Sequence, residues 1–283
     1  DLYGREDLAR DKSSPTAETS VLYWSNTWGF WPPVGLFQTV MTEALVMQHS
    51  GMGSFAKEGR FEGRTFMVAG LDPSFTEDGD GCILRFGTVG ELSQGKLGIE
   101  LGERVKIPIK VGEDIYYQIA QRTVRECRDR GLEPRHLGID TTSGGKGVAD
   151  IVSREWGVGV NRVGFGEVAS EITVSTEDWR PARDVYDDRG TELWYQVREF
   201  MVSGQLRGLD RQSVIEFTKR EIEQRGRKIK VEEKRIVKKK IGHSPDDADA
   251  VAILVDTARV NGAIAVPQVS GSDRVVSPWV SSA

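Results

Sequence analysis

The stretch RTFMVAGLDPS, residues 64–74, places a run of apolar residues directly before an aspartate, a proline and a serine. An apolar run of this length, closed by turn-forming residues, predicts a buried β-strand that ends at Asp72. Two more runs of the same kind follow at residues 81–90 and 96–109, and the turns between them contain Gly and Ser. Three consecutive strands joined by short turns predict an antiparallel meander.

Beyond the meander the pattern changes to alternating helices and strands. Apolar residues at helical spacing, with Gly131 near their end, predict a helix over 112–132. By the same reasoning we expect helices at 147–157, 191–206, 213–223 and 245–260, short strands at 136–140 and 160–166, and a hairpin-like basic segment at 228–240. This order predicts an α/β protein with the RNase H-like fold, in which a mixed β-sheet (antiparallel meander plus parallel strands) carries helices on both faces.

Length and composition favour one sizeable globular domain, or one such domain plus a fragment. The chain has 283 residues, of which 38% are hydrophobic and 29% are charged, and a chain of this size can bury a real core. The regular pattern begins near residue 61 and fades near residue 265. We therefore expect a folded domain at 61–265, an N-terminal linker or remnant of a preceding region at 1–60, and a flexible C-terminal tail at 266–283. The first residue is not Met, which indicates a piece of a longer protein.

Composition disfavours several kinds of site. Cys82 and Cys127 stand in unlike contexts without paired or metal-site spacing, which indicates a reducing compartment and no disulfide framework. Only three histidines occur, so we expect any bound metal to be a hard cation held by oxygen. No apolar run approaches the roughly 20 residues that a membrane-spanning helix needs, so we expect no membrane partner.

One segment imitates a nucleotide-binding loop. GELSQGKL, residues 90–97, matches a phosphate-binding P-loop as far as Gly95 and Lys96, but Leu97 stands where the loop needs Ser or Thr to hold magnesium. The segment also lies between two predicted strands instead of opening a helix. We interpret it as a hairpin turn and expect no ATP site in this chain.

Four aspartates stand where a functional site would form. Asp72 and Asp140 end two predicted strands, and Asp246 and Asp249 lie one turn apart at the start of the last predicted helix. Ligands of open α/β sheets gather at the carboxyl ends of the strands, so we expect the two strand aspartates to approach one another and the helix to add its pair. Carboxylates this close repel one another unless a cation lies among them. Mg²⁺ or Mn²⁺ suits oxygen ligands, and two such ions are the recurring machinery of phosphodiester hydrolysis.

Both strand aspartates also have a structural explanation. Asp72 begins the tripeptide DPS, which is typical of a turn. Asp140 precedes TTSGG and is equally suited to cap a loop between a strand and a helix.

The helix aspartates are explained only in part by capping. Ser244 is a suitable N-cap with Pro245 at the first helical position, and Asp246 and Asp247 would then favour the helix dipole. This does not explain Asp249, which shares a helix face with Asp246 beside small residues. Two carboxylates stacked on a buried face are costly without a counter-ion. Asp247 points to another side of the helix and is the weaker metal candidate.

The basic segment is a candidate DNA contact. The net charge of −5 does not favour nucleic acid, but Lys and Arg concentrate at residues 225–242. A solvated hairpin face is the alternative explanation. Beside a carboxylate cluster, such a segment would neutralise backbone phosphates without reading sequence, and the glycines at 144–147 would allow close approach of a DNA strand. The candidate phosphate contacts are Lys146, Lys228, Lys230, Lys234, Arg235, Lys238, Lys239 and Lys240.

Over about residues 61–262 the sequence resembles the nuclease domain of the large terminase subunit of tailed bacteriophages, a DNA-packaging motor subunit. GLDPSFTEDGDGC at 70–82 and GIDTTSGGKGVADIV at 138–152 resemble its two strand-end aspartate motifs. RGTELWYQVREFMVSGQL at 189–206 and KKKIGHSPDDADAVAIL at 238–254 resemble its later helices. The resemblance implies that Asp72, Asp140, Asp246 and Asp249 bind two divalent ions, Mg²⁺ or Mn²⁺, with Asp247 as a further candidate.

The resemblance also implies an activity and its partners. It implies a metal-dependent endonuclease that cleaves concatemeric double-stranded DNA in the cytoplasm of the infected host cell and leaves a 5′-phosphate and a 3′-hydroxyl. Its partners would be the portal, the small terminase subunit and an ATPase domain, and residues 1–60 would be the remnant of that ATPase region or a linker from it. Two alternatives remain, namely a Holliday-junction resolvase or RNase H-type nuclease, and a non-catalytic nucleic-acid-binding module.

Overall fold

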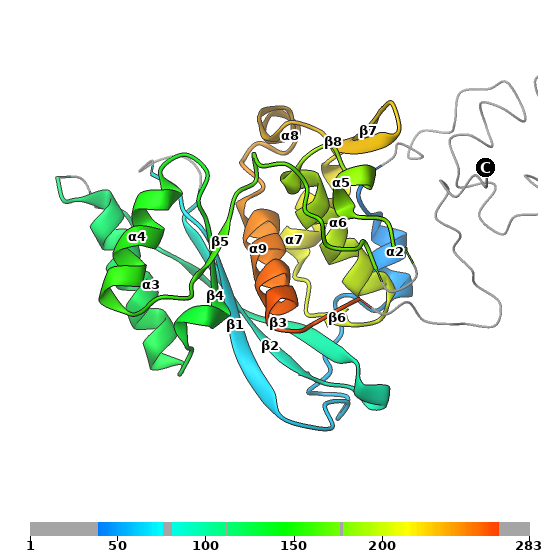
Figure 1. Ribbon diagram of the computed structural model, residues 1–283, viewed down its shortest axis with the longest axis horizontal. Helices are drawn as coiled ribbons and strands as arrows, with labels where there is room; N and C mark the ends of the chain where they lie inside the picture. Colours follow the sequence, from blue (N-terminus) through cyan, green and yellow to red (C-terminus); the bar gives the residue numbers. More distant parts are fainter. Residues whose placement is uncertain (1–38, 76–80, 111, 176–177, 266–283) are drawn as a thin grey trace, which may run out of the picture. The chain divides into compact units, whose positions relative to one another are not determined.

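A six-stranded mixed sheet in the order β5-β4-β1-β2-β3-β6 forms the centre of the described part of the chain. The computed structural model describes residues 39–75, 81–110, 112–175 and 178–265 (Figure 1). β1, β2 and β3 are antiparallel neighbours, whereas β4 and β5 continue the sheet in parallel with β1, and β6 runs parallel to β3. The predicted antiparallel meander plus parallel strands is therefore confirmed. The strands are β1 (Thr65–Asp72), β2 (Ile83–Glu91), β3 (Leu97–Lys106), β4 (Leu137–Asp140), β5 (Asn161–Val163) and β6 (Leu206–Arg207).

Helices cover both faces of the sheet, as the sequence predicts (Figure 1). α3 and α4 lie on one face, and α9 lies on the other with α6 and α7 beyond it. A separate two-stranded hairpin, β7 (Ile222–Arg225) and β8 (Lys228–Val231), precedes α8. The described helices are α2 (Glu43–Gln48), α3 (Ile115–Asp129), α4 (Gly145–Glu155), α5 (Ala182–Val185), α6 (Arg189–Val202), α7 (Arg211–Lys219), α8 (Lys234–Ile241) and α9 (Asp246–Val260), with short 3-10 turns at Ser93–Gly95 and Pro134–His136.

Alternation along the strands assigns the two faces. Ala69 and Leu71 of β1 belong to the buried apolar cluster under α3 and α4. Gly70 faces α9, because a Cβ there would lie 2.3 Å from the carbonyl oxygen of Ala250. Since side chains alternate with period two, Asp72 must share the α9 face with Gly70.

The same argument applies to β4. A Cβ at Gly138 would lie 2.1 Å from Thr257 Oγ1 of α9, so only glycine permits this approach of helix to strand. Asp140 lies two residues after Gly138 and is on the same face. The two glycines thus let α9 rest directly on β1 and β4, next to the ends of both strands.

The structure corrects three predicted elements. The helix predicted for 213–223 ends at Lys219, and Ile222 and Glu223 belong to β7. The segment at 228–240 is not one hairpin, because β8 ends at Val231 and α8 begins at Lys234. Val237 and Ile241 are spaced for one helix face, and Gly242, with φ of 84°, ends the helix in the left-handed conformation. The helix predicted for 191–206 ends at Val202, after which Gly204 with φ of 73° turns the chain into β6.

Other features agree with the prediction or lie outside the described residues. The P-loop-like segment is a short turn between β2 and β3, as expected. Both cysteines are buried and free. No helix in the described ranges is long and apolar enough to cross a membrane. The predicted domain limits stay predictions, because residues 1–38 and 266–283 lie outside the described residues. Residues 39–60 contribute the buried side chains of Val46 and Phe55. They also contact β6, where Arg207 donates to the carbonyls of His49 and Ser50.

Candidate active site

β1 and β4 deliver two aspartates to one edge of the sheet. Leu71 pairs with Ile139 in parallel register, so the next residues, Asp72 and Asp140, leave the sheet side by side on the α9 face. Asp72 is 5% exposed, and Asp140 is half-buried. The pairing brings together two carboxylates that are far apart in the sequence.

α9 adds Asp246 and Asp249 to this edge. The helix is held at Gly70 and Gly138 through Ala250, Ile253 and Thr257. Positions one turn apart on this helix share its sheet-facing side, so Asp246 and Asp249 lie above the strand ends. Both aspartates are buried, at 5% and 4% exposure. Four aspartates from three elements therefore meet at one site.

Three of these carboxylates have one oxygen fixed by an N–H donor. The backbone N–H of Gly81 donates to Asp246 Oδ2 over 2.6 Å. The backbone N–H of Thr142 donates to Asp140 Oδ1 over 2.8 Å. The indole N–H of Trp194 donates to Asp249 Oδ1 over 2.7 Å. In Asp246 and Asp249 this bond leaves the second carboxylate oxygen to face the middle of the cluster.

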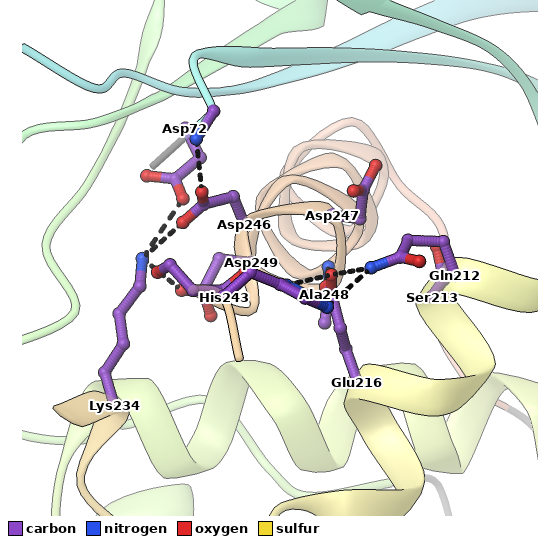
Figure 2. A network of polar contacts seen from close by, with 12 residues as sticks. Asp72, Gln212, Ser213, Glu216, Lys234, His243, Asp246, Asp247, Ala248 and Asp249 are labelled. Carbon is purple, nitrogen blue, oxygen red and sulfur yellow. Dashed lines mark hydrogen bonds and ion pairs between the residues drawn. The ribbon is translucent and has the colours of Figure 1, made fainter. Parts of the chain in front are cut away.

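Lys234 of α8 reaches into the middle of the cluster (Figure 2). Its ammonium Nζ lies 3.3 Å from Asp72 Oδ2, 3.1 Å from Asp246 Oδ1 and 2.9 Å from Asp249 Oδ2. The oxygens of Asp246 and Asp249 that bind Lys234 are those that the N–H donors leave free. A single positive charge therefore bridges three carboxylates in this structure.

The site is electrostatically strained by burial and by like charges. Burial, together with the neighbouring carboxylates of Asp249, Asp246 and Asp140, raises the pKa of Asp72 well above its ordinary value, although Lys234 opposes this. Burial also raises the pKa of Asp140. Burial alone would lower the pKa of Lys234, but the three carboxylates hold it above its ordinary value. The site thus holds four carboxyl groups beside one ammonium group, and burial disfavours the charged forms of Asp72, Asp140 and Lys234.

Asp247 is not brought to the cluster. It points away from the other aspartates (Figure 2) and forms a two-pronged ion pair with Arg104 of β3, in which Nη2 lies 3.0 Å from Oδ2 and Nε binds Oδ1. Asp247 is 4% exposed, and this partner accounts for its burial without a metal ion.

The basic candidates are divided between the site and its surroundings. Lys146 is exposed at the start of α4, just after the loop that follows Asp140. Lys238 and Lys239 are exposed on α8, and Lys238 lies one turn after Lys234 on the same helix side. Lys228 is half-buried. The remaining candidates form ion pairs with carboxylates of the same chain: Lys230 with Asp187 and Asp188, Arg235 with Glu233, and Lys240 with Glu221 and Glu232.

Sequence reasoning missed the residue that caps α9. The expected cap, Ser244, makes no capping hydrogen bond, and Pro245 occupies the N-cap position. Glu216 of α7 takes this role: its Oε2 accepts from the backbone N–H of Ala248 over 2.7 Å, and its Oε1 accepts from Gln212 Nε2 over 2.9 Å (Figure 2). A carboxylate from another helix therefore supports the aspartate-bearing turn.

We expect Glu216→Gln to raise the stability of the protein at alkaline pH. Burial raises the pKa of Glu216 to about 8, so between its ordinary value and about 8 the folded protein holds a proton that the unfolded chain has released. The free energy of unfolding therefore falls as pH rises through this window. Glutamine keeps the acceptor for Ala248 but carries no charge. At pH 9 we expect the free energy of unfolding of the variant to exceed that of the parent by a few kcal/mol, and each kcal/mol corresponds to roughly 2–4 °C in Tm. At pH 5 we expect little difference.

Thermal unfolding of both proteins across pH 5–9 tests this expectation. Glu62→Gln removes the same charge at an exposed position and should follow the parent at every pH. If the curves of Tm against pH for Glu216→Gln and the parent run parallel, the raised pKa of Glu216 is contradicted.

The donor chemistry of the cluster suits a divalent cation at the position of the Lys234 ammonium. The donors are carboxylate oxygens, which hard cations such as Mg²⁺ and Mn²⁺ prefer. Among the described residues, no three His, Cys, Asp or Glu side chains are arranged to hold a metal ion as they stand. In this arrangement Asp246 Oδ1 and Asp249 Oδ2 contact the Lys234 ammonium. Binding of a metal ion would therefore require Lys234 to withdraw.

Comparisons with known proteins agree on the fold. No protein-family model matches the sequence, and no curated protein matches it. Among solved structures, the nuclease domain of the large terminase subunit gp2 of bacterial virus Sf6 is similar, with a TM-score of 0.55 and 13% identity over 77% of this chain and 98% of that chain. A lysine-to-alanine variant of that domain was solved with calcium (TM-score 0.55) and with manganese (TM-score 0.52), each at 15% identity over 77% of this chain and 99% of that chain. This chain therefore has the RNase H-like fold of a phage large terminase nuclease domain.

Proposed function

We propose that this chain is the nuclease domain of a phage DNA-packaging terminase and cleaves concatemeric double-stranded DNA with the help of divalent cations. The observation that carries this proposal is the meeting of Asp72, Asp140, Asp246 and Asp249 at the carboxyl ends of β1 and β4. The shared fold and the manganese in the similar Sf6 domain add support. The portal, the small terminase subunit, an ATPase domain and the host cytoplasm follow from the resemblance and stay part of the proposal.

The four aspartates would hold two ions, either Mg²⁺ or Mn²⁺. When bound, such ions activate a water molecule and stabilise the attacking and leaving oxygens of the phosphodiester. The role of the chain is to hold the carboxylates in place beforehand. Gly81, Thr142 and Trp194 each fix one carboxylate oxygen, which reduces the reorganisation needed when the substrate arrives.

The basic helix α8 would place the DNA backbone beside these carboxylates. Lys238 and Lys239 are exposed on the helix that delivers Lys234 to the cluster, so phosphates bound by α8 would lie next to the site. Lys146 would contribute from the other side, at the start of α4. Contacts of this kind depend on charge and not on base sequence.

Cleavage assays on three substrates test the proposal. We expect the protein to cut linear and plasmid double-stranded DNA in Mg²⁺ or Mn²⁺, to stop in EDTA, and to leave 5′-phosphate ends that a ligase can rejoin. Preference for four-way junctions would instead indicate a resolvase, and cleavage of the RNA strand of a hybrid an RNase H-type enzyme. Binding without any cleavage would leave only a nucleic-acid-binding module.

We expect a Lys238→Ala, Lys239→Ala double variant to bind DNA more weakly and with less dependence on salt. Each lost phosphate contact reduces the magnitude of the slope of log affinity against log salt concentration by about 0.9, so the slope of the double variant should be smaller than that of the parent by about 1.8. Fluorescence anisotropy of a labelled duplex at several salt concentrations measures both quantities. The control is a Lys57→Ala, Lys96→Ala double variant, which removes the same amount of charge. Lys57 lies in the segment before β1, and Lys96 lies in the turn between β2 and β3, at the end of the sheet opposite to Asp72. Equal slopes for the two double variants would exclude α8 from the DNA interface.

A further inference from the structure

The buried side of Asp249 is held by Trp194 of α6. The indole Nε1–H donates to Asp249 Oδ1 over 2.7 Å, and Trp194 is fully buried. An indole N–H can only donate, and a buried donor without an acceptor is costly. The ring and the carboxylate are therefore tied to one another.

The Trp194 ring has little freedom to move. Phe217 of α7 packs edge-on against it, with 4.8 Å between ring centroids. The guanidinium of Arg220 lies 4.3 Å from the ring centroid on its face, and Arg220 is itself fixed because its Nε donates to the carbonyl of Glu232 over 2.8 Å. A ring packed in this way holds its N–H at one place.

The fixed N–H decides which oxygen of Asp249 is available to the cluster. With Oδ1 bound to Trp194, Oδ2 faces the other carboxylates and lies 2.9 Å from Lys234 Nζ. Arg220 Nη1 lies 3.8 Å from the same Oδ1, close enough to attract the whole carboxylate if the indole bond were lost. Asp246 and Asp140 are fixed by backbone N–H groups, which a substitution does not remove. Asp249 instead depends on the side chain at position 194.

We propose that Trp194 is a positioning residue of the nuclease centre, whose N–H keeps Asp249 Oδ2 turned toward the place where the carboxylates would hold a divalent cation, and away from Arg220. This inference rests on the proposed function. It predicts that the N–H, more than the bulk of the ring, determines the affinity of the site for a metal ion. Residues that orient a metal ligand typically contribute 10- to 100-fold to metal affinity or activity.

The test is calorimetric titration of the protein with Mn²⁺ in the absence of DNA. Trp194→Phe removes the N–H and part of the ring. Site-specific incorporation of 3-benzothienylalanine at position 194 replaces N–H by sulfur in a ring of nearly the same size, so it tests the bond alone if the phenylalanine variant folds poorly. We expect Kd for Mn²⁺ to rise about 10- to 100-fold in both proteins, with a matching rise in the Mn²⁺ concentration needed for half-maximal cleavage.

Phe217→Leu is the matched control. It loosens packing on the same ring but leaves the N–H of Trp194 and Asp249 in place, so we expect a lower Tm and a Kd for Mn²⁺ within about twofold of the parent. If the benzothienylalanine protein binds Mn²⁺ as tightly as the parent, the positioning role is wrong, whereas the proposed nuclease stands because the parent still binds and cleaves. If the parent itself neither binds Mn²⁺ nor cleaves DNA, both proposals fail together.

Discussion

Asp72→Asn and Asp140→Asn proteins are expected to lose DNA cleavage by on the order of 10³-fold while remaining folded. A metal ion contributes several kcal/mol to the transition state of phosphodiester hydrolysis, and 1.36 kcal/mol corresponds to tenfold in rate. Asn keeps the size of the side chain but is a poorer ligand for a hard cation. Initial rates of plasmid linearisation at saturating Mn²⁺ measure the loss.

Stability separates a lost ligand from a damaged fold in the Asp72 variant. Burial and like charges raise the pKa of Asp72, so its ionised form is less favourable in the folded protein than in the unfolded chain. Removing that charge should therefore leave Tm unchanged or raise it when no divalent cation is present. In the same variant, the increase in Tm that Mn²⁺ gives the parent by binding the native state should disappear.

α9 offers a matched pair of substitutions for the same experiment. Asp249→Asn should lose cleavage, because Asp249 contacts the cluster. Asp247→Asn should keep cleavage but lower Tm, because Asp247 pairs with Arg104 and lies outside the cluster. Cleavage unaffected by substitution of Asp72 and Asp140, or lost equally in both α9 variants, would remove the metal-dependent mechanism.

The local part of this site follows from the sequence. The apolar runs before Asp72 and Asp140 mark strand ends, and parallel strands bring their carboxyl ends to one edge. The helical spacing of Asp246 and Asp249 places both on one side of α9. Each of these inferences uses only a strand or helix period and a general rule of sheet topology.

The partners of the aspartates do not follow from the sequence, because they come from distant segments. Arg104 and Asp247 are 143 residues apart, and Gly81 and Asp246 are 165 apart. Glu216 looks like an ordinary polar position of α7, and Lys234 looks like one basic residue among many. Which of these charges is directed inward depends on how α7 and α8 pack around α9, and periodicity gives no information about that packing. Two features of the sequence indicate α8: Val237 and Ile241 are spaced for one face of a helix, and Gly242 stands where a helix would end.

The second large effect is expected from Lys234→Met, which removes the ammonium and keeps most of the apolar stem. Without divalent cations, Asp72, Asp246 and Asp249 lose their shared positive partner, so the variant should be less stable than the parent. Breaking a fully buried ion pair costs about 3–5 kcal/mol. The Lys234 side chain is 42% exposed, so solvent screening reduces the expected loss to roughly 1–2 kcal/mol.

When divalent cations are present, the order of stability of Lys234→Met and the parent should reverse. Two like unit charges about 4 Å apart repel by roughly 1–4 kcal/mol at effective dielectric constants between those of water and a protein surface, and a divalent cation carries two such charges. Lys234→Met should therefore bind Mn²⁺ at least about tenfold more tightly. Titration without DNA keeps this measurement independent of any phosphate contact by Lys234. Lys239→Met removes a charge from the exposed side of α8 and should change neither the apo stability nor the Mn²⁺ affinity by a comparable amount. If Lys234→Met instead binds Mn²⁺ no better than the parent, the ammonium does not hold the place of a metal ion, and the three carboxylates with their lysine are a structural ion cluster.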